Sequence, residues 1–167
     1  MENKDDIRLL NSEQLKDFLI NKNHEKFRVD QISDWLWNKG VDSFSKMSNV
    51  SNDLKKLLDK NFLLKKPIEI KSYKSIDRTI KYSIQLFDKN LIEAVLIPSN
   101  KRVTACISSQ VGCSLDCKFC ATSRLIRKRN LFCYEIFDQL FFLNEKSKFF
   151  LKEKYQMLFL WGWENLF

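Results

Sequence analysis

The chain has 167 residues, of which 44% are hydrophobic, and it carries a formal net charge of +8. Its length suits one ordinary domain or two small ones, and its apolar fraction excludes wholesale disorder. It contains no apolar run of the roughly 18 residues that a membrane span needs, and its start, MENKDDIRLLNSEQ, is unlike a signal peptide. We therefore expect a cytoplasmic protein that binds no membrane, in which cysteines serve metal sites or catalysis rather than disulfides.

The composition is biased in two ways. Glycine occurs 3 times and proline 2 times, where usual frequencies give about 12 and about 8. The favoured residue types, among them Lys, Asn, Ile and Phe, mostly have AT-rich codons, so a drifted genome composition explains the bias better than a structural requirement does. The positive charge suits a nucleic-acid partner, although a genome bias toward AT-rich codons, which favours lysine, by itself produces much of this charge.

Residues 11–62 have the apolar spacing of helices. Asn11 can cap a first helix in a capping box with Gln14, a second helix in KFRVDQISDWLWNKG can end at Gly40, and SNDLKKLLDKNF predicts a third. These short helices predict a small helical domain over residues 1–64. Its core is expected to contain Leu15, Phe18, Leu19, Val29, Ile32, Trp35, Leu36, Leu54, Leu57 and Leu58.

Beyond Pro67 the apolar period changes to that of strands. Ile80, Tyr82 and Ile84 alternate strictly with polar residues. Two further runs, LIEAVLIP and RVTACISS, predict strands, and polar segments such as SIDRT and DKN predict turns. We expect connecting β-strands over residues 65–100.

From about residue 101 the order becomes strand, cysteine-rich loop, helix and strand. The helix in LFCYEIFDQLFFLNEK has Ile136, Leu140 and Leu143 in register on one face, and Cys133 is expected in the core. The segment QMLFL then predicts a buried strand. This βαβ order is typical of the start of a parallel sheet or barrel, so we predict the α/β class. One such unit cannot close a barrel by itself.

The loop QVGCSLDCKFCAT holds Cys113, Cys117 and Cys120, three of the five cysteines of the chain. Structural zinc usually takes four Cys or His ligands in two close pairs. The next candidate ligand is Cys133, within a helix, and the one histidine, His24, lies far back in the chain. Three thiolates can instead hold three irons of a [4Fe–4S] cluster and leave the fourth iron open to a small molecule. A zinc-bound structural module stays open as an alternative.

The spacing C-x3-C-x2-C directly after a strand, with Phe119 before the third cysteine, resembles the radical S-adenosylmethionine (SAM) enzymes. More narrowly, ACISSQVGCSLDCKFCAT, RNL, EIFDQ and the upstream FRVDQISDWLWNKGVDSFSKMSNVSNDLKKLL and DRTIKYSIQLFDKNLIEAVLIP resemble the RlmN-type methyltransferases. The resemblance implies an RNA-binding helical domain, connecting strands, and the start of a radical SAM partial (β/α) barrel over residues 101–167. It also implies a monomeric enzyme that methylates C2 of an adenine in 23S rRNA and in tRNA anticodon loops.

The resemblance also implies roles for five residues. Cys113, Cys117 and Cys120 match the ligands of a [4Fe–4S] cluster, on whose open iron SAM is cleaved to a radical. Glu93 matches the proton acceptor of the reaction. Cys106 matches the cysteine that resolves a protein–RNA adduct, which is formed through a methyl-carrying cysteine near the family's C-terminus. By themselves, Glu93 would be a solvated strand carboxylate and Cys106 a small buried apolar residue.

The chain departs from the family pattern at two places. After CAT the family continues Gly-x-x-Gly-Phe-x-Arg-Asn-Leu, whereas residues 123–131 read SRLIRKRNL, so we expect an altered loop geometry. After QMLFL the family has Met-Gly-Met-Gly-Glu-Pro, whereas this chain ends in LWGWENLF. Codons for LWGWENLF can encode Met-Gly-Met-Gly-Glu-Pro-Phe in another frame, so we hypothesise a one-base frame change in the gene.

We therefore expect a truncated chain that lacks the SAM-binding turn, most of the barrel and the methyl-carrying cysteine, and that is inactive as a methyltransferase. An incomplete barrel leaves strand edges unpaired. A non-catalytic RNA-binding remnant, using the helical domain and the positive charge, stays open as a second alternative.

Overall fold

The computed structural model describes residues 4–99, 102–113, 126–151 and 157–161. Four features of the sequence lie outside these ranges: Cys117, Cys120, the start of the altered continuation at 123–125 and the ending at 162–167. The chain divides into two compact units, residues 1–65 and residues 66–167. Among the described residues, no helix combines the length and apolar character needed to cross a membrane.

The first unit is helical. Its segments are the 3₁₀ turn η1 (Ile7–Leu9), α1 (Ser12–Asn21), α2 (Arg28–Ser33), the π-helical turn η2 (Asp34–Asn38), the 3₁₀ turn η3 (Phe44–Lys46) and α3 (Asn52–Asn61).

The ends of these helices follow the local signals of the sequence. The Asn11 carboxamide oxygen accepts from the backbone N–H of Gln14 at 2.8 Å, and the Gln14 side chain accepts from the backbone N–H of Asn11 at 2.9 Å. Ser51 caps α3, and Gly40 ends the second helical segment with a φ of 61°. The predicted helices are confirmed, but the π-helical turn at the end of α2 was not predicted by the apolar period.

The helical unit has its own core. Of the residues expected there, seven are buried, and Phe18, Trp35 and Leu57 pack partly buried against them. Near the start of the unit, the Asp6 carboxylate forms a buried ion pair with the Arg8 guanidinium at 2.8 Å. The same carboxylate accepts from the backbone N–H of Lys65 at 2.7 Å, and this hydrogen bond joins the two ends of the unit.

The second unit contains one main sheet, in the order β1-β2-β3-β4-β7. Neighbouring strands from β1 to β4 are antiparallel, while β4 and β7 are parallel and joined through α4. This βαβ connection confirms the α/β fold class. The elements are β1 (Ile68–Lys74), β2 (Ile80–Gln85), β3 (Leu91–Pro98), β4 (Val103–Ser108), β5 (Gln110–Val111), β6 (Arg129–Asn130), α4 (Cys133–Leu151) and β7 (Met157–Trp161).

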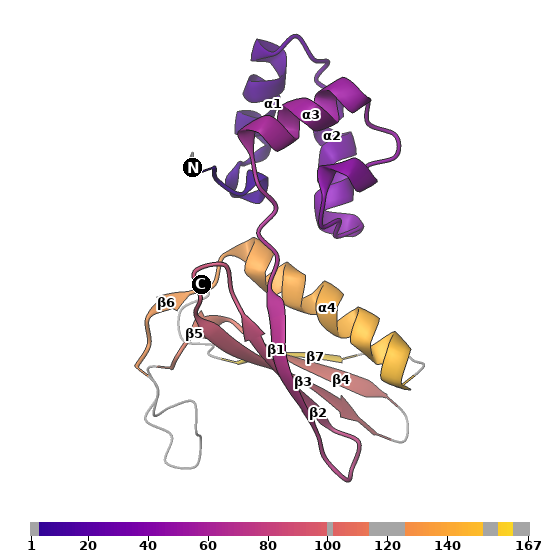
Figure 1. Ribbon diagram of the computed structural model, residues 1–167, viewed down its shortest axis with the longest axis vertical. Helices are drawn as coiled ribbons and strands as arrows, with labels where there is room; N and C mark the ends of the chain where they lie inside the picture. The colour runs from indigo at the N-terminus through magenta and orange to yellow at the C-terminus, as the bar shows by residue number, and fades with distance from the viewer. Residues whose placement is uncertain (1–3, 100–101, 114–125, 152–156, 162–167) are drawn as a thin grey trace. The chain divides into compact units, whose positions relative to one another are not determined.

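Helix α4 packs on one face of this sheet, against β3 and β4 (Figure 1). The alternating residues of β2, β3 and β4 form the core beneath the helix, which confirms the alternation predicted for β2, and Leu143 of α4 is fully buried among them. The strands predicted separately, before and after residue 100, therefore share one sheet. The proposed boundaries at residues 64 and 100 stay predictions.

The apolar face predicted for α4 is confirmed, since Leu143 is buried in the core of the sheet and Ile136 and Leu140 pack against it, but the buried surface of the helix extends beyond this face. Cys133, expected in the core, is exposed. The buried residues of this helix are Tyr134, Glu135, Asp138, Gln139, Leu143 and Ser147, and most of them carry a polar group. The spacing of apolar residues cannot predict this part of the buried surface, because polar side chains are also buried when hydrogen bonds satisfy them.

Candidate functional site

Glu93 and Cys106 lie on neighbouring strands and point to the same face of the sheet. Ala94 of β3 and Ala105 of β4 belong to the core beneath α4, and successive side chains of a strand point to opposite faces. Glu93 and Cys106 therefore project from the face that α4 does not cover. Cys106 pairs directly with Val95, and Glu93 stands two residues before Val95 on β3. Glu93 is therefore the diagonal neighbour of Cys106, and residues in this relation are usually about 7–8 Å apart.

Glu93 combines a fixed backbone with an accessible carboxylate. Its Oε1 lies 2.9 Å from Nζ of Lys81, and the two side chains are 38% and 45% exposed. An ion pair this exposed contributes only about 0–1 kcal/mol. The hydroxyl of Ser108 donates to the carbonyl oxygen of Glu93 at 2.8 Å, which joins β4 to β3 at this point. The carboxylate can thus exchange Lys81 for another partner at little cost.

Cys106 is buried, with 4% of its surface exposed. Burial raises the pKa of its thiol to about 11. At neutral pH the side chain is therefore a neutral thiol, whereas the nucleophilic form of cysteine is the thiolate. Any reaction of Cys106 near pH 7 needs a proton acceptor, and Glu93 is a carboxylate on the same face.

Cys113 stands where the chain enters the cysteine loop. It is partly buried and forms a parallel bridge with Ile126, at the point where the chain leaves residues 114–125. No disulfide joins the described cysteines Cys106, Cys113 and Cys133. Within the described ranges no three His, Cys, Asp or Glu side chains gather around a common point, but Cys117 and Cys120 are not among these residues.

The two arms beside the cysteine loop form a small antiparallel sheet, which the sequence did not predict. We call residues 109–113 and 126–131 the neck. Gln110 pairs with Asn130 and Val111 with Arg129. The backbone N–H of Lys128 donates to the carbonyl of Val111 at 2.8 Å. The neck thus brings both ends of the cysteine loop together.

Gly112 permits this close approach. Its φ is 75°, in the left-handed region that favours glycine. A Cβ on Gly112 would lie 2.3 Å from the carbonyl oxygen of Ile126 and 2.9 Å from Cα of Arg127. Because a side chain cannot fit there, one of the 3 glycines of this glycine-poor chain stands directly before Cys113.

Known proteins resemble both parts of the chain. Residues 6–64 match the family model described as the ribosomal RNA large subunit methyltransferase N-terminal domain. A probable dual-specificity RNA methyltransferase RlmN of Flavobacterium johnsoniae is 45% identical over 147 residues, which are 88% of this chain and 42% of that protein. The corresponding protein of Cytophaga hutchinsonii is 48% identical over 143 residues, which are 85% of this chain and 39% of that protein.

Over most of its length, this chain is a relative of the RlmN-type methyltransferases. It spans about two fifths of the length of these relatives. A crystal structure of a radical SAM methyltransferase from Sphaerobacter thermophilus matches the fold with a TM-score of 0.75 over 92% of this chain and 45% of that one. Its sequence identity of 24% supports the fold alone.

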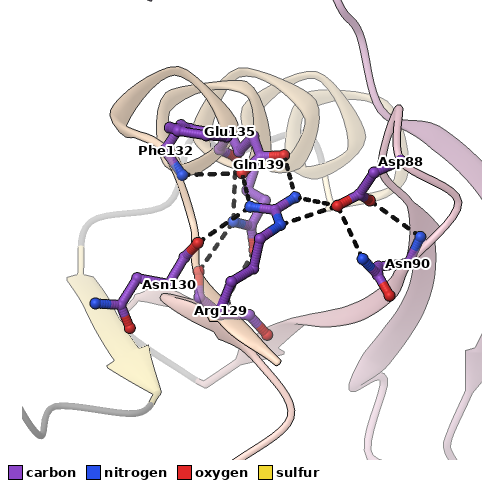
Figure 2. A network of polar contacts seen from close by, with 8 residues as sticks. Asp88, Asn90, Arg129, Asn130, Phe132, Glu135 and Gln139 are labelled. Carbon is purple, nitrogen blue, oxygen red and sulfur yellow. Dashed lines mark hydrogen bonds and ion pairs between the residues drawn. The ribbon is translucent and has the colours of Figure 1, made fainter. Parts of the chain in front are cut away.

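Two segments that resemble the RlmN-type proteins, RNL and EIFDQ, meet in a polar network beside the neck. Figure 2 shows the guanidinium of Arg129 between the carboxylates of Asp88 and Glu135. Its Nη1 and Nη2 donate to the two oxygens of Glu135 at 2.7 and 2.8 Å, and its Nε and Nη2 donate to Asp88 at 2.9 and 2.7 Å. The hydrogen bonds to Glu135 raise the pKa of Arg129 further above its ordinary value.

Asp88 is held ionised by the same network. Burial alone would raise the pKa of its carboxyl, but hydrogen bonds from Arg129 and Asn90 outweigh this effect and lower the pKa. Asp88 lies in the turn between β2 and β3, so the network joins this turn to β6 and to the first turn of α4.

Gln139 of EIFDQ fixes the end of β4. The backbone N–H of Ser108 donates to its carboxamide oxygen at 2.9 Å, and its carboxamide nitrogen donates to the carbonyl of Ser108 at 3.0 Å. Gln139 is fully buried. In the sequence, RNL and EIFDQ indicate only the resemblance, and no local signal predicts a role for Arg129, Glu135 or Gln139.

Proposed function

We propose that the sheet unit is the cluster-binding part of a radical SAM methyltransferase that acts on C2 of an adenine in 23S rRNA and tRNA, as a cytoplasmic monomer. The main support is the arrangement of three residues that match functional positions of the family. Glu93 and Cys106 share the face of the sheet opposite α4, and Cys113 follows on the same chain segment after β4.

The donor chemistry fits an iron–sulfur cluster. Thiolates are the ligands that such clusters use, and Cys113 is partly exposed at the closed base of its loop. Together with Cys117 and Cys120 it would bind the cluster. When bound, the cluster and SAM supply the radical chemistry that methylation of an unreactive ring carbon requires.

The chain's own residues would manage protons and the adduct. Glu93 would accept a proton once an RNA base replaces Lys81 beside it. Cys106 would stay a protonated thiol until it is needed, because burial keeps its pKa near 11. The surrounding strands hold both residues in fixed positions.

These 167 residues would not complete methyl transfer by themselves. The chain spans about two fifths of the relatives' length, and no described residue matches the family's methyl-carrying cysteine. We expect cluster binding without turnover.

Anaerobic reconstitution of the full chain with iron and sulfide tests the cluster. We expect a brown protein with about four irons and four sulfides per chain. Replacing Cys113, Cys117 and Cys120 together by Ala should abolish the colour, whereas Cys133→Ala, the exposed cysteine outside the loop, should keep it. Stoichiometric zinc without iron in the purified chain would support the zinc-bound module and contradict the proposal.

Incubation of the reconstituted chain with SAM, a reductant and a 23S rRNA fragment tests the predicted lack of turnover. We expect no C2-methylated adenine by mass spectrometry. Detection of that product would show that the 167 residues are sufficient for the reaction.

A second candidate function is RNA binding by the helical unit without catalysis. It is favoured by the match of residues 6–64 to the N-terminal domain of the family and by the net charge of +8. RNA affinity that is unchanged when the three loop cysteines are replaced would support this function. Affinity that disappears with the cluster would instead assign RNA binding to the sheet unit.

A further inference from the structure

We propose that Arg129 is a positioning residue for Cys113, because its guanidinium holds the neck in shape before any cluster is present. The inference rests on the proposed function in one respect, namely that Cys113 is a cluster ligand. It goes beyond that function by assigning a positioning role to a residue that is not one of the proposed cluster ligands.

The guanidinium of Arg129 joins three segments that are distant in sequence. It contacts Asp88 in the β2–β3 turn and both carboxylate oxygens of Glu135 on α4, while its own backbone belongs to β6 (Figure 2). The same Glu135 carboxylate accepts from the backbone N–H of Phe132 at 2.9 Å and so also fixes the start of α4. The side chain of Glu135 is only 6% exposed, and that of Arg129 is 25% exposed.

This arrangement requires arginine rather than any cation. A guanidinium is planar and offers five donors in a fixed fork, which matches a carboxylate with two parallel hydrogen bonds. Lysine is a compact charge on a flexible stem and cannot contact both oxygens of Glu135 and Asp88 in this geometry. On the Glu135 side, where the carboxylate is only 6% exposed, the charge-assisted bonds of the fork are stronger than those of an exposed pair.

The backbone of the neck transmits this fixation to Cys113. Arg129 pairs with Val111, and Val111 is followed by Gly112, which has no room for even one added carbon against Ile126. Cys113 then bridges to Ile126 itself. Movement of β6 would therefore open the neck and displace Cys113, whereas the end of β4 would stay fixed by Gln139.

A neck that is closed in advance favours cluster binding. Bringing the ends of a flexible loop together costs conformational entropy, and a site ordered beforehand does not lose that entropy when it binds its ligand. Residues 114–125 carry the other two proposed ligands, and the described arms on either side of them are already paired in the neck.

Two measurements on Arg129→Gln and Arg129→Lys test the inference, with the exposed Arg102→Gln as the matched control. Hydrogen exchange of the Lys128 and Leu131 amides, whose acceptors are Val111 and Ser109, reports neck opening in the cluster-free chain. The rate of iron loss after anaerobic reconstitution reports how firmly the cluster is held. We expect both Arg129 variants to accelerate each process about tenfold or more, as the loss of charge-assisted hydrogen bonds implies, and the control to match the wild type.

The outcomes separate the inference from the proposed function. Unchanged amide exchange and iron loss in Arg129→Gln would overturn the inference, and full rescue by Arg129→Lys would overturn the role of the fork. If the wild-type chain binds no iron, the proposed function fails, while faster amide exchange in the Arg129 variants alone would still support positioning of Cys113.

Gly112→Ala tests the same neck from its other arm if Arg129→Gln does not fold. Gly40→Ala is its control, because Gly40 also has a positive φ, 61° against 75°, but lies in the helical unit. We expect faster exchange at Lys128 and faster iron loss in Gly112→Ala only. Equal behaviour of the two glycine variants would overturn the inference.

Discussion

The polar contacts that cap the helices of the first unit and those that surround the proposed site in the second unit differ in their range along the sequence. In the helical unit, the helix caps join residues three apart, Asn11 with Gln14 and Ser51 with Leu54. In the sheet unit, the polar contacts near the site join residues 31 and 41 positions apart, such as Ser108 with Gln139. The residues to which we assign chemistry all belong to the second unit, so the proposed site depends on contacts that only the folded chain makes.

The largest effect is expected from deleting core side chains in each unit. Leu58→Ala and Leu143→Ala remove fully buried leucines from two separate clusters, and each should cost about 2–5 kcal/mol through the cavity it leaves. Hydrogen exchange along the chain should show that each substitution destabilises its own unit. If both variants destabilised the two units equally, the separation of the cores would be wrong.

A smaller effect should distinguish long-range from local polar contacts. Gln139→Leu leaves the buried N–H and carbonyl of Ser108 without their partners and should cost about 2–3 kcal/mol. Asn11→Ala removes an exposed cap and should cost about 1 kcal/mol. Urea unfolding of both variants measures the difference, and an equal or larger loss in Asn11→Ala would contradict the comparison.

High pH should weaken the sheet unit through Cys106. Burial raises the pKa of this thiol to about 11 from the ordinary value of 9.0. Because the folded state binds the proton more tightly than the unfolded state, the resulting stability is fully present below pH 9 and is lost as the pH rises toward 11. The stability of the wild type relative to Cys106→Ala should therefore fall by about 1–2 kcal/mol over this range.

The comparison with Cys106→Ala subtracts the effects of lysines and tyrosines that also lose protons at high pH. Urea unfolding of the two proteins at pH 8, 9, 10 and 11 gives the difference directly. A difference that stays constant across these pH values would show that the Cys106 thiol is not held protonated by the fold.

The smallest effect concerns the exposed end of the Arg129 network. Asp88→Asn should cost only about 0.5 kcal/mol near neutral pH, because this carboxylate is 38% exposed. The lowered pKa of Asp88 means that this stability is present above the unfolded pKa of about 4 and is lost as the pH falls through the lower folded value.

Asp42→Asn is the matched control in the helical unit, since Asp42 and Lys46 form an ion pair four residues apart that is more than half exposed. We expect this change to cost less than Asp88→Asn at pH 7. Thermal unfolding at pH 7 and pH 3 measures both variants, and an Asp88 effect that is as large at pH 3 as at pH 7 would contradict the assignment.

Much of the fold was predictable because its signals are local. The capping box at Asn11, the stop at Gly40 and the alternation from Ile80 to Ile84 each act within a few residues and are confirmed. The polar part of the buried face of α4 was not predictable in this way. Polar Glu135 and Gln139 are buried there because Arg129 and Ser108 satisfy them, whereas the apolar period indicates only Ile136, Leu140 and Leu143.

The sequence by itself predicted the helices, the main strands and the βαβ order, since helix caps and apolar periods are formed by residues close together in the chain. The proposed site residues came from the C-x3-C-x2-C spacing and from the family resemblance. Only the tertiary structure decided which of these residues meet. The register of β3 on β4 brings Glu93 beside Cys106 on one face, and the fork of Arg129 and the bare backbone of Gly112 close the neck at Cys113. Hydrogen bonds between residues tens of positions apart, such as Ser108 with Gln139, form only when α4 packs on the sheet, so a local sequence pattern cannot predict them.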